Sequence, residues 1–389
     1  MSTLHSATSA LNTSTLAERV IRGTVYTHFK KMNSLHTCFP GASDVSSFFS
    51  HRTSCGLRTS YPLLNDHSKN LFGGVMLPWT KWCWTPSDCD LRPFLKAESC
   101  KLISKSGTSE SQIDILFVGD SMTHQMYESF YMLHDGPGQP AGKHDAKVQT
   151  VCDGKARVLF IRNDYIATSS SFEACSGKTD SLSEHQRFPD KRTSICGDWT
   201  QYVARASIIV LNSGAHVIPA AKYNAVIQNT TEWLRKNADG KQIIFRTTPP
   251  GHAGCNFFDE PTTSLPSEQT LVDRLIEKQF GWDKVHAHNV LAAKHFKSLK
   301  NAFVLDVENM TTLRPDGHRG DFGDCLVCLC YAPTRCVCQD TMFCTMLITD
   351  RSSRSPVADV VQHYYLPGVV DEWVRLLFNF LAGEIGPND

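Results

Sequence analysis

The tripeptide Gly119-Asp120-Ser121 stands where a short apolar run, residues 115–118, meets a helical pattern that extends to about Leu133. A serine at such a junction lies beyond the carboxyl end of the strand, where open α/β sheets bind ligands. Its backbone N–H lies at a helix N-terminus and can stabilise an oxyanion. Ser121 is therefore a candidate nucleophile, although a serine at this position also suits a simple helix cap.

Five ordered blocks of sequence surround this serine. They read WCWTPSDCDLRPF at 82–94, IVLNSGAH at 209–216, FRTTPPGH at 245–252, LRPDGH at 313–318 and HYYLPGVVDEW at 363–373. In this order and spacing they resemble the PC-esterase family, which comprises the trichome birefringence-like and Cas-type polysaccharide O-acetyltransferases of the SGNH/GDSL hydrolase type. The resemblance extends from about residue 82 to residue 381, and the chain before residue 79 does not take part in it.

The resemblance implies a Ser-His-Asp triad. Ser121 matches the nucleophile of the family's Gly-Asp-Ser motif, and His363 matches the histidine of its Asp-x-x-His motif ahead of Leu-Pro-Gly. In acyl transfer the imidazole takes the serine proton, and a carboxylate fixes the tautomer of the imidazole and stabilises its charged form.

Further site candidates follow the later strands. Asn212 and Gly214, at the end of the run 206–211, are candidate oxyanion donors together with the Ser121 N–H, although both also suit a turn at a strand exit. The substrate-cleft candidates are Asp120, His216, Arg246 and His252. The two histidines also suit a purely structural role.

The Asp-x-x-His motif is interrupted in this chain. Val360 stands three residues before His363, and Asp359 is one position too early. If residues 327–362 were removed, Asp324 would stand three residues before His363 and the motif would be restored. We therefore expect Asp324 to be the triad acid, with Asp359 as the less favoured candidate.

The segment 327–362 has three interpretations. It begins Val-Cys and ends Gln, so its codons can begin GT and end AG, as an unspliced intron does. It also holds five of the 15 cysteines, which leaves an even number elsewhere, as a disulfide framework prefers. A genuine insertion loop is the second interpretation. A zinc site is the third, because Cys325 and Cys328 have C-x-x-C spacing, but the usual second ligand pair is missing.

The elements that must position these residues are short apolar runs that alternate with helical stretches. Strands are expected at 115–118, 156–161, 206–211, 242–246 and 302–306, and helices over about 267–299 and 369–381, the last ending at Gly383. This alternation predicts an α/β fold, and with the family resemblance a three-layer α/β/α sandwich with a mainly parallel sheet. Residues 1–75 are expected to be a loosely ordered leader, and 76–389 the catalytic domain.

Composition excludes some classes of function. The 39 basic and 39 acidic residues balance, which argues against binding to nucleic acid or to an anionic membrane through charge. No apolar run reaches the length of a membrane span. The widely spaced cysteines indicate disulfides in a secretory compartment, the Golgi lumen or outside the cell, with Cys83, Cys89 and Cys100 among those paired. The opening residues show no signal peptide, so we expect an upstream signal or anchor to be missing.

The resemblance implies O-acyl transfer, of acetyl above all, to hydroxyls of a cell-wall or secreted polysaccharide. Two alternatives stay open: an esterase with the same triad, and a glycan-binding relic whose disrupted acid makes it inactive. We expect no bound metal or cofactor, an acyl donor as co-substrate and a glycan as acceptor.

Overall fold

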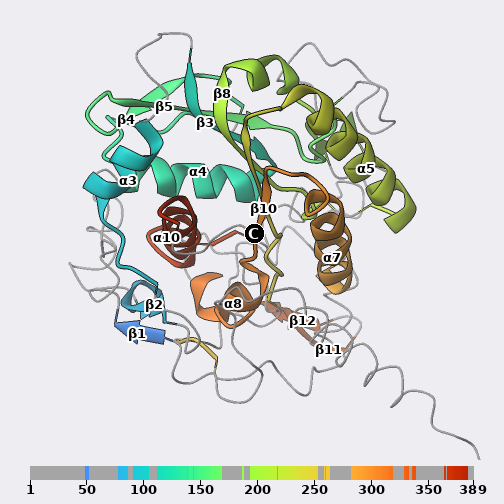
Figure 1. Cartoon of the computed structure of the whole chain (residues 1–389). Coiled ribbons are helices and arrows are strands. Elements are labelled where there is room, and N and C mark those ends of the chain that lie inside the picture. The colour runs from blue at the N-terminus through green and yellow to red at the C-terminus, as the bar shows by residue number, and fades with distance from the viewer. Residues whose placement is uncertain are drawn as a thin grey trace, which may run out of the picture.

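Short apolar runs form the central sheet of the computed structural model, whose six strands lie in the order β10-β9-β8-β3-β5-β4 (Figure 1). Strand β3 is buried at all seven positions, as expected of a parallel strand covered on both faces. All pairings are parallel except that of β4 at the edge. The strands are β3 (Ile113–Gly119), β4 (Gln149–Val151), β5 (Ala156–Arg162), β8 (Ala206–Leu211), β9 (Gln242–Arg246) and β10 (Ala302–Leu305).

The structure describes residues 49–51, 78–85, 91–104, 112–137, 139–142, 144–168, 186–187, 193–216, 218–252, 258, 260–262, 282–318, 328–332, 335–338, 363–364 and 366–383. Among them, no helix is both long enough and apolar enough to cross a membrane.

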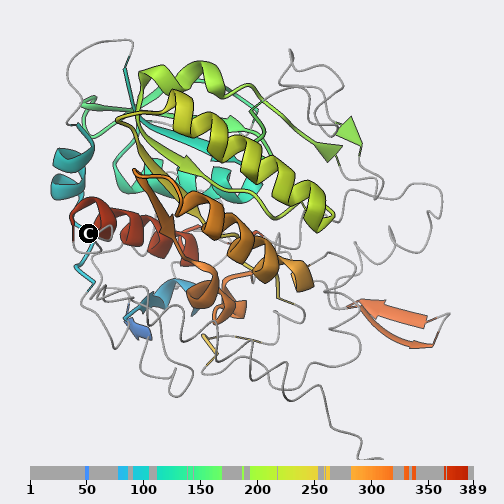
Figure 2. The ribbon, with the colours of Figure 1, turned by 45° about the vertical axis from the view of Figure 1, so that its right-hand side comes forward.

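Helices cover both faces of the sheet. Ile115 and Phe117 of β3 pack with α4 (Ser121–Leu133) and α10 (Val369–Leu381), whereas Leu116 and Val118 pack with α5 (Ala220–Asn237) and α7 (Val285–Phe296). Figures 1 and 2 show α4 beside α10 and α5 beside α7. The alternation of side chains along a strand thus divides the core into two layers. The predicted α/β/α sandwich with a mainly parallel sheet is confirmed.

Most predicted elements agree with the structure. The five predicted strands are present, and the C-terminal helix ends before Gly383, whose φ of 81° is typical of a residue that follows a helix. Of the predicted helix over 267–299, the structure describes η7 and α7, and residues 263–281 lie outside the described part. The remaining short elements are η2 (Pro78–Lys81), β6 (Gln186–Arg187), β7 (Thr193–Ser194), η5 (Thr200–Arg205), η7 (Trp282–Lys284), α8 (Glu308–Thr312) and η8 (Pro315–His318).

The predicted leader contains one described element. Strand β1 (Phe49–His51) pairs antiparallel with β2 (Trp82–Trp84), and the rest of residues 1–75 lies outside the described part.

Arg375 of α10 fixes the segment that follows β2. Its guanidinium donates to the backbone carbonyls of Trp84, Leu91 and Arg92 at 2.7, 2.8 and 3.0 Å, and it pairs with Glu372 at 3.1 Å. All of these groups come from the two ends of the domain. The buried cation therefore ties the tryptophan-rich block to the last helix.

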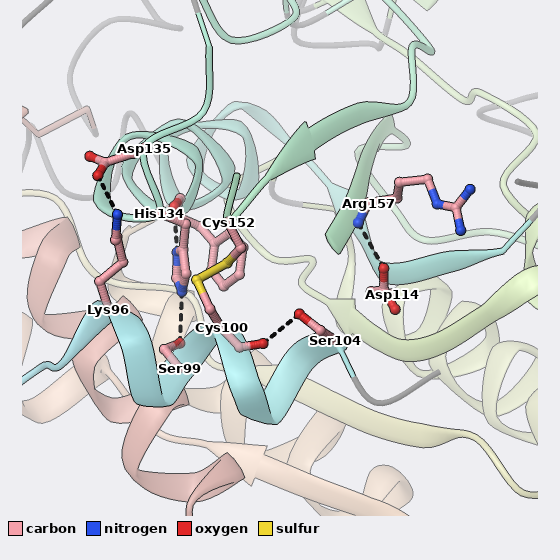
Figure 3. The surroundings of a disulfide bond; sticks show 10 residues. Lys96, Ser99, Cys100, Ser104, Asp114, His134, Asp135, Cys152 and Arg157 are labelled. Carbon is pink, nitrogen blue, oxygen red and sulfur yellow. Dashed lines mark hydrogen bonds and ion pairs between the residues drawn. A yellow bond between two sulfur atoms is a disulfide. The ribbon is translucent and has the colours of Figure 1, made fainter. Parts of the chain in front are cut away.

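The helix α3 (Lys96–Ile103) is attached to the sheet by a disulfide between Cys100 and Cys152, whose Cα atoms are 5.6 Å apart (Figure 3). Cys83 and Cys196 are also disulfide-bonded. The prediction that Cys83 and Cys100 each take part in a disulfide is thus confirmed. Cys89 lies outside the described residues.

His134 joins α3 to the end of α4 (Figure 3). Its Nδ1 lies 2.7 Å from the Phe130 carbonyl, which can only accept, so Nδ1 carries the proton and Nε2 accepts from the Ser99 hydroxyl at 2.7 Å. The ring is fully buried, and burial lowers the pKa of His134 to about 4. The fold therefore requires neutral His134.

Acid should destabilise the fold through His134. The unfolded histidine binds a proton below pH 6.5, whereas the folded one resists it down to about pH 4. The free energy of unfolding should therefore fall as the pH drops through this window, by up to about 3 kcal/mol from this residue. Urea unfolding of the wild type and of His134→Gln between pH 7.5 and 4.5 measures this. An equal dependence on pH in both proteins would contradict the assignment.

Candidate active site

Ser121 is the first residue of α4 and lies directly after β3, at the point where the strand order changes direction. Next to it, β5 lies on one side of β3 and β8 on the other, which is the position where open α/β sheets bind ligands. Ser121 is 8% exposed. The structure thus places the predicted nucleophile at the site that the topology favours.

The helix cap is Asp120 and not Ser121. Its Oδ1 accepts from the backbone N–H groups of Met122 and Thr123 at 2.9 and 3.3 Å. The alternative reading of Ser121 as the cap is therefore wrong, because the neighbouring carboxylate does this work. Asp120 was also expected in the substrate cleft. Its side chain is fully buried, and the cleft assignment stays a prediction.

Gly119 allows this turn to pack closely. A Cβ atom on Gly119 would lie 2.2 Å from the Thr123 hydroxyl and 2.7 Å from the Asn212 carbonyl oxygen. Any side chain here would push β3 and α4 away from β8, so the family's Gly-Asp-Ser order has a steric reason.

Gln125 brings the segment of His363 to the helix turn that carries Ser121. Its Nε2 donates to the Tyr364 carbonyl at 2.6 Å, and its Oε1 accepts from the Tyr364 N–H at 3.0 Å. Residues four apart lie on the same face of a helix, so Ser121 stands one turn before Gln125 on that face. These two hydrogen bonds, called the Gln125 clamp below, therefore hold Tyr364, the residue next to His363, one helix turn from the predicted nucleophile. Gln125 was not singled out from the sequence, since nothing marks a glutamine inside a helix as a clamp.

Both candidate triad acids lie outside the described residues. The backbone of the segment 327–362 is described in part: β11 (Cys328–Ala332) pairs antiparallel with β12 (Arg335–Cys338). The assignment of Asp324 over Asp359 and the three interpretations of the segment stay predictions. In the described part of the chain, no group of three His, Cys, Asp or Glu side chains could hold a metal ion.

Asn212 has a different role from the predicted one. Its backbone N–H donates to Val118, and its side-chain amide donates to the Arg246 carbonyl and the Thr248 hydroxyl at 2.9 and 2.8 Å. All its N–H groups are thus donated within the protein, and Asn212 supports the site rather than binding an oxyanion. Gly214 keeps its place as a main-chain candidate, with a φ of 144° and a Cβ position only 2.6 Å from the Thr248 hydroxyl.

A cluster of buried charges lies beneath Ser121. The Asp120 carboxylate interacts electrostatically with His216, Arg246 and Asp164, and burial raises the pKa of Asp120 while His216 and Arg246 oppose this. Arg246 is fully buried, donates to the Thr247 carbonyl and the Thr123 hydroxyl, and lies 4.8 Å from the ring centre of Trp373. Burial lowers the pKa of Arg246 to about 10, which leaves it charged at neutral pH.

This cluster brings three predicted cleft residues together, but below the site. Asp120 and Arg246 are fully buried and His216 is 5% exposed, so the first two do not form the wall of an open cleft. Asp164, which the sequence did not mark, pairs with Arg162 at 2.9 Å and lies 3.6 Å from His216 Nε2. We infer that the cluster sets the electrostatic field at the N-terminus of α4.

His252, the fourth cleft candidate, contacts a second buried histidine. Its Nδ1 lies 2.9 Å from His318 Nε2, and His318 Nδ1 lies 2.6 Å from the His363 carbonyl oxygen. His318 stands in the block 313–318 but was not selected as a site residue, because its link to His363 spans 45 positions of sequence.

The amino-acid sequence of this chain is similar to those of known proteins. Residues 216–380 match the model of the family described as PC-Esterase, the GDSL/SGNH-like acyl-esterase family found in Pmr5 and Cas1p. A probable xylan O-acetyltransferase 11 from Oryza sativa subsp. japonica is 25% identical in an alignment of 346 residues that covers 77% of this chain and 75% of that protein. Xylan O-acetyltransferase 3 from the same plant is 22% identical in an alignment of 341 residues that covers 79% of this chain and 68% of that protein.

These matches confirm the resemblance found in the sequence: the chain is similar to the PC-esterase family of GDSL/SGNH-like acyl-esterases, over residues 216–380 in the family match, which contain α5, β9 and β10.

Proposed function

We propose that this protein transfers an acyl group, acetyl above all, to a hydroxyl of a polysaccharide through an acyl-enzyme on Ser121. The observation that carries the proposal is the Gln125 clamp, which joins the helix turn of Ser121 to the segment of His363. The relatives support an acyltransferase or esterase of polysaccharides in general. Xylan, which their names give as the acceptor, is the first glycan to test.

In the proposed mechanism, Ser121 Oγ attacks the carbonyl carbon of the acyl donor while His363 takes the hydroxyl proton. The leaving group departs with that proton. A sugar hydroxyl then attacks the acyl-enzyme, with His363 as base, and Ser121 is released. The N-terminus of α4, with the Ser121 N–H and the Gly214 N–H, would stabilise the oxyanion in both steps.

The acceptor distinguishes transferase from esterase, because the same triad serves both and only exclusion of water separates them. An assay with a labelled acetyl donor and several glycans decides: label in the glycan supports transfer, label in free acetate supports the esterase, and label retained in the donor supports the binding relic. The disulfides at Cys83, Cys100, Cys152 and Cys196 support a secretory location.

Ser121→Ala should abolish turnover, by a factor on the order of a million, because the nucleophile is lost. Folding should be unchanged, since the cap is Asp120. The matched control is Ser298→Ala, at an exposed serine after α7, which should keep full activity. Steady-state kinetics and thermal unfolding of both variants measure this. Substantial turnover by folded Ser121→Ala would exclude Ser121 as the nucleophile.

Gln125→Met keeps the side-chain length but removes both hydrogen bonds to Tyr364. We expect kcat to fall by roughly a hundredfold through misplacement of His363. KM should change little, because the substrate contacts are not touched. Gln125→Glu keeps the acceptor for the Tyr364 N–H and should lose less. If Gln125→Met is as active as the wild type, the clamp does not position the base.

Deletion of residues 327–362 should keep the protein folded and raise its yield, because closing this loop costs about 3 kcal/mol of chain entropy. In that shortened chain, Asp324→Asn should abolish activity. In the full chain, Asp359→Asn should leave activity unchanged. Loss of activity in Asp359→Asn together with an unfolded deletion variant would show that the segment is a real part of the site.

A further inference from the structure

His252 and His318 form a chain of hydrogen bonds that ends on the backbone of His363. His252 Nε2 lies 2.9 Å from the Thr312 carbonyl oxygen, His252 Nδ1 lies 2.9 Å from His318 Nε2, and His318 Nδ1 lies 2.6 Å from the His363 carbonyl oxygen. His318 is fully buried, and its ring centre lies 3.9 Å from that of Tyr364, with the two ring planes tilted by 36°. The chain thus leads from α8 through two rings to the predicted catalytic histidine.

The number of protons that this chain requires is fixed by its two ends. A carbonyl oxygen only accepts, so His252 Nε2 and His318 Nδ1 must both carry hydrogen. A neutral imidazole has a single N–H, so two neutral rings have two, and the contacts with the two carbonyl oxygens use both of them. The contact between the two rings then needs a third proton. All three bonds exist together only when the pair holds one proton more than two neutral rings have.

The surroundings oppose that extra proton. Burial is the largest cause that lowers the pKa of His252 to about 4, and Arg314 acts in the same direction while Asp316 and the Thr312 carbonyl oppose it. Burial also lowers the pKa of His318, the nearby His252 and His363 side chains lower it further, and the hydrogen bond to the His363 carbonyl opposes this. Asp316 is already paired with Arg314 at 2.8 Å, and the Tyr364 hydroxyl donates to the Pro250 carbonyl. Near neutral pH the pair therefore has two protons for three contacts.

This shortage makes two acceptors compete for the proton of His318. On Nδ1 the proton anchors the His363 carbonyl, and on Nε2 it bonds to His252. In the second tautomer, a lone pair of His318 faces the His363 oxygen, and this repulsion releases the anchor.

We propose that His318 is a positioning residue for His363, and that His252 decides which nitrogen of His318 carries the proton. Uptake of one proton by the pair satisfies all three bonds and fixes the His363 backbone. Loss of that proton leaves the anchor in competition with His252. The effect on catalysis rests on the function proposed above, whereas the tautomer assignment does not.

The tautomers are measured by long-range ¹H–¹⁵N spectroscopy of the full-length protein labelled with ¹⁵N-histidine, from pH 8 to pH 4. We expect His252 Nε2 to carry hydrogen throughout, and the protonation of His318 Nδ1 to rise from partial toward complete in one step centred near pH 4, so that the step is about half finished at the acid end of this range. His252→Asn places a neutral N–H donor near the position of Nδ1. In this variant His318 Nδ1 should be protonated at every pH.

Two results would overturn the proposal. One is a wild-type His318 Nδ1 that is fully protonated at all pH values and does not respond to His252→Asn. The other is an Nδ1 that never carries hydrogen. Neither result depends on activity, so failure of the proposed function and failure of this inference are distinguishable.

Kinetics provide the second arm of the test. His318→Asn keeps a donor near the position of Nδ1, whereas His318→Leu removes it. We expect kcat to fall by roughly a hundredfold in His318→Leu with KM unchanged, and to recover for the most part in His318→Asn. Equal loss in both folded variants would mean that the ring has only a packing role. If His318→Leu does not fold, the spectra of the wild type and His252→Asn decide.

Discussion

The carboxyl edge of the sheet depends on the side chain of Asn212. Its backbone N–H continues the pairing of β8 with β3, its Oδ1 accepts from Thr123 of α4, and its Nδ2 donates to the Arg246 carbonyl and the Thr248 hydroxyl. Three other segments, β3, α4 and residues 246–248, thus meet at this one fully buried asparagine. Buried polar groups must find partners, and here each partner also fixes a strand end. An aliphatic residue at this position would leave several of these groups without partners, and the turn of Ser121 would lose its support.

The sheet could be predicted from the sequence because its strands are buried on both faces and read as continuous apolar runs. The helix α10 was predicted for the same reason, since a wide apolar stripe covers most of its surface. By contrast, α5 was not predicted. Its buried face includes Thr230 and Thr231 beside Ile227 and Leu234, and the two threonines interrupt the apolar repeat that marks a helix. Their hydroxyls donate to backbone carbonyls, which is how they are tolerated in the core.

The site was predicted in its positions but less well in its roles. The sequence pattern predicts a mainly parallel sheet, and the carboxyl ends of parallel strands meet at one edge, where the structure places Ser121, Asn212 and Arg246. Which of them is a cap, a support or a catalytic group depends on which backbone N–H and C=O groups nearby are not already paired within a helix or strand. Asp120 rather than Ser121 caps α4 because Oδ1 of the aspartate reaches two free N–H groups. The link from His318 to His363 joins blocks that no local pattern connects.

The hydrogen bonds of Arg375 have a consequence for the synthesis of the chain. The carbonyls that it holds belong to residues that leave the ribosome 283 to 291 positions earlier. Until α10 has been made, the block around Trp84 lacks both its buried cation and the helix face on which it packs. Contacts between such distant residues form late, after the loop between them has been closed. The first part of this domain can therefore complete its packing only after the last part has been synthesised. Until then the nascent chain exposes its tryptophan-rich segment.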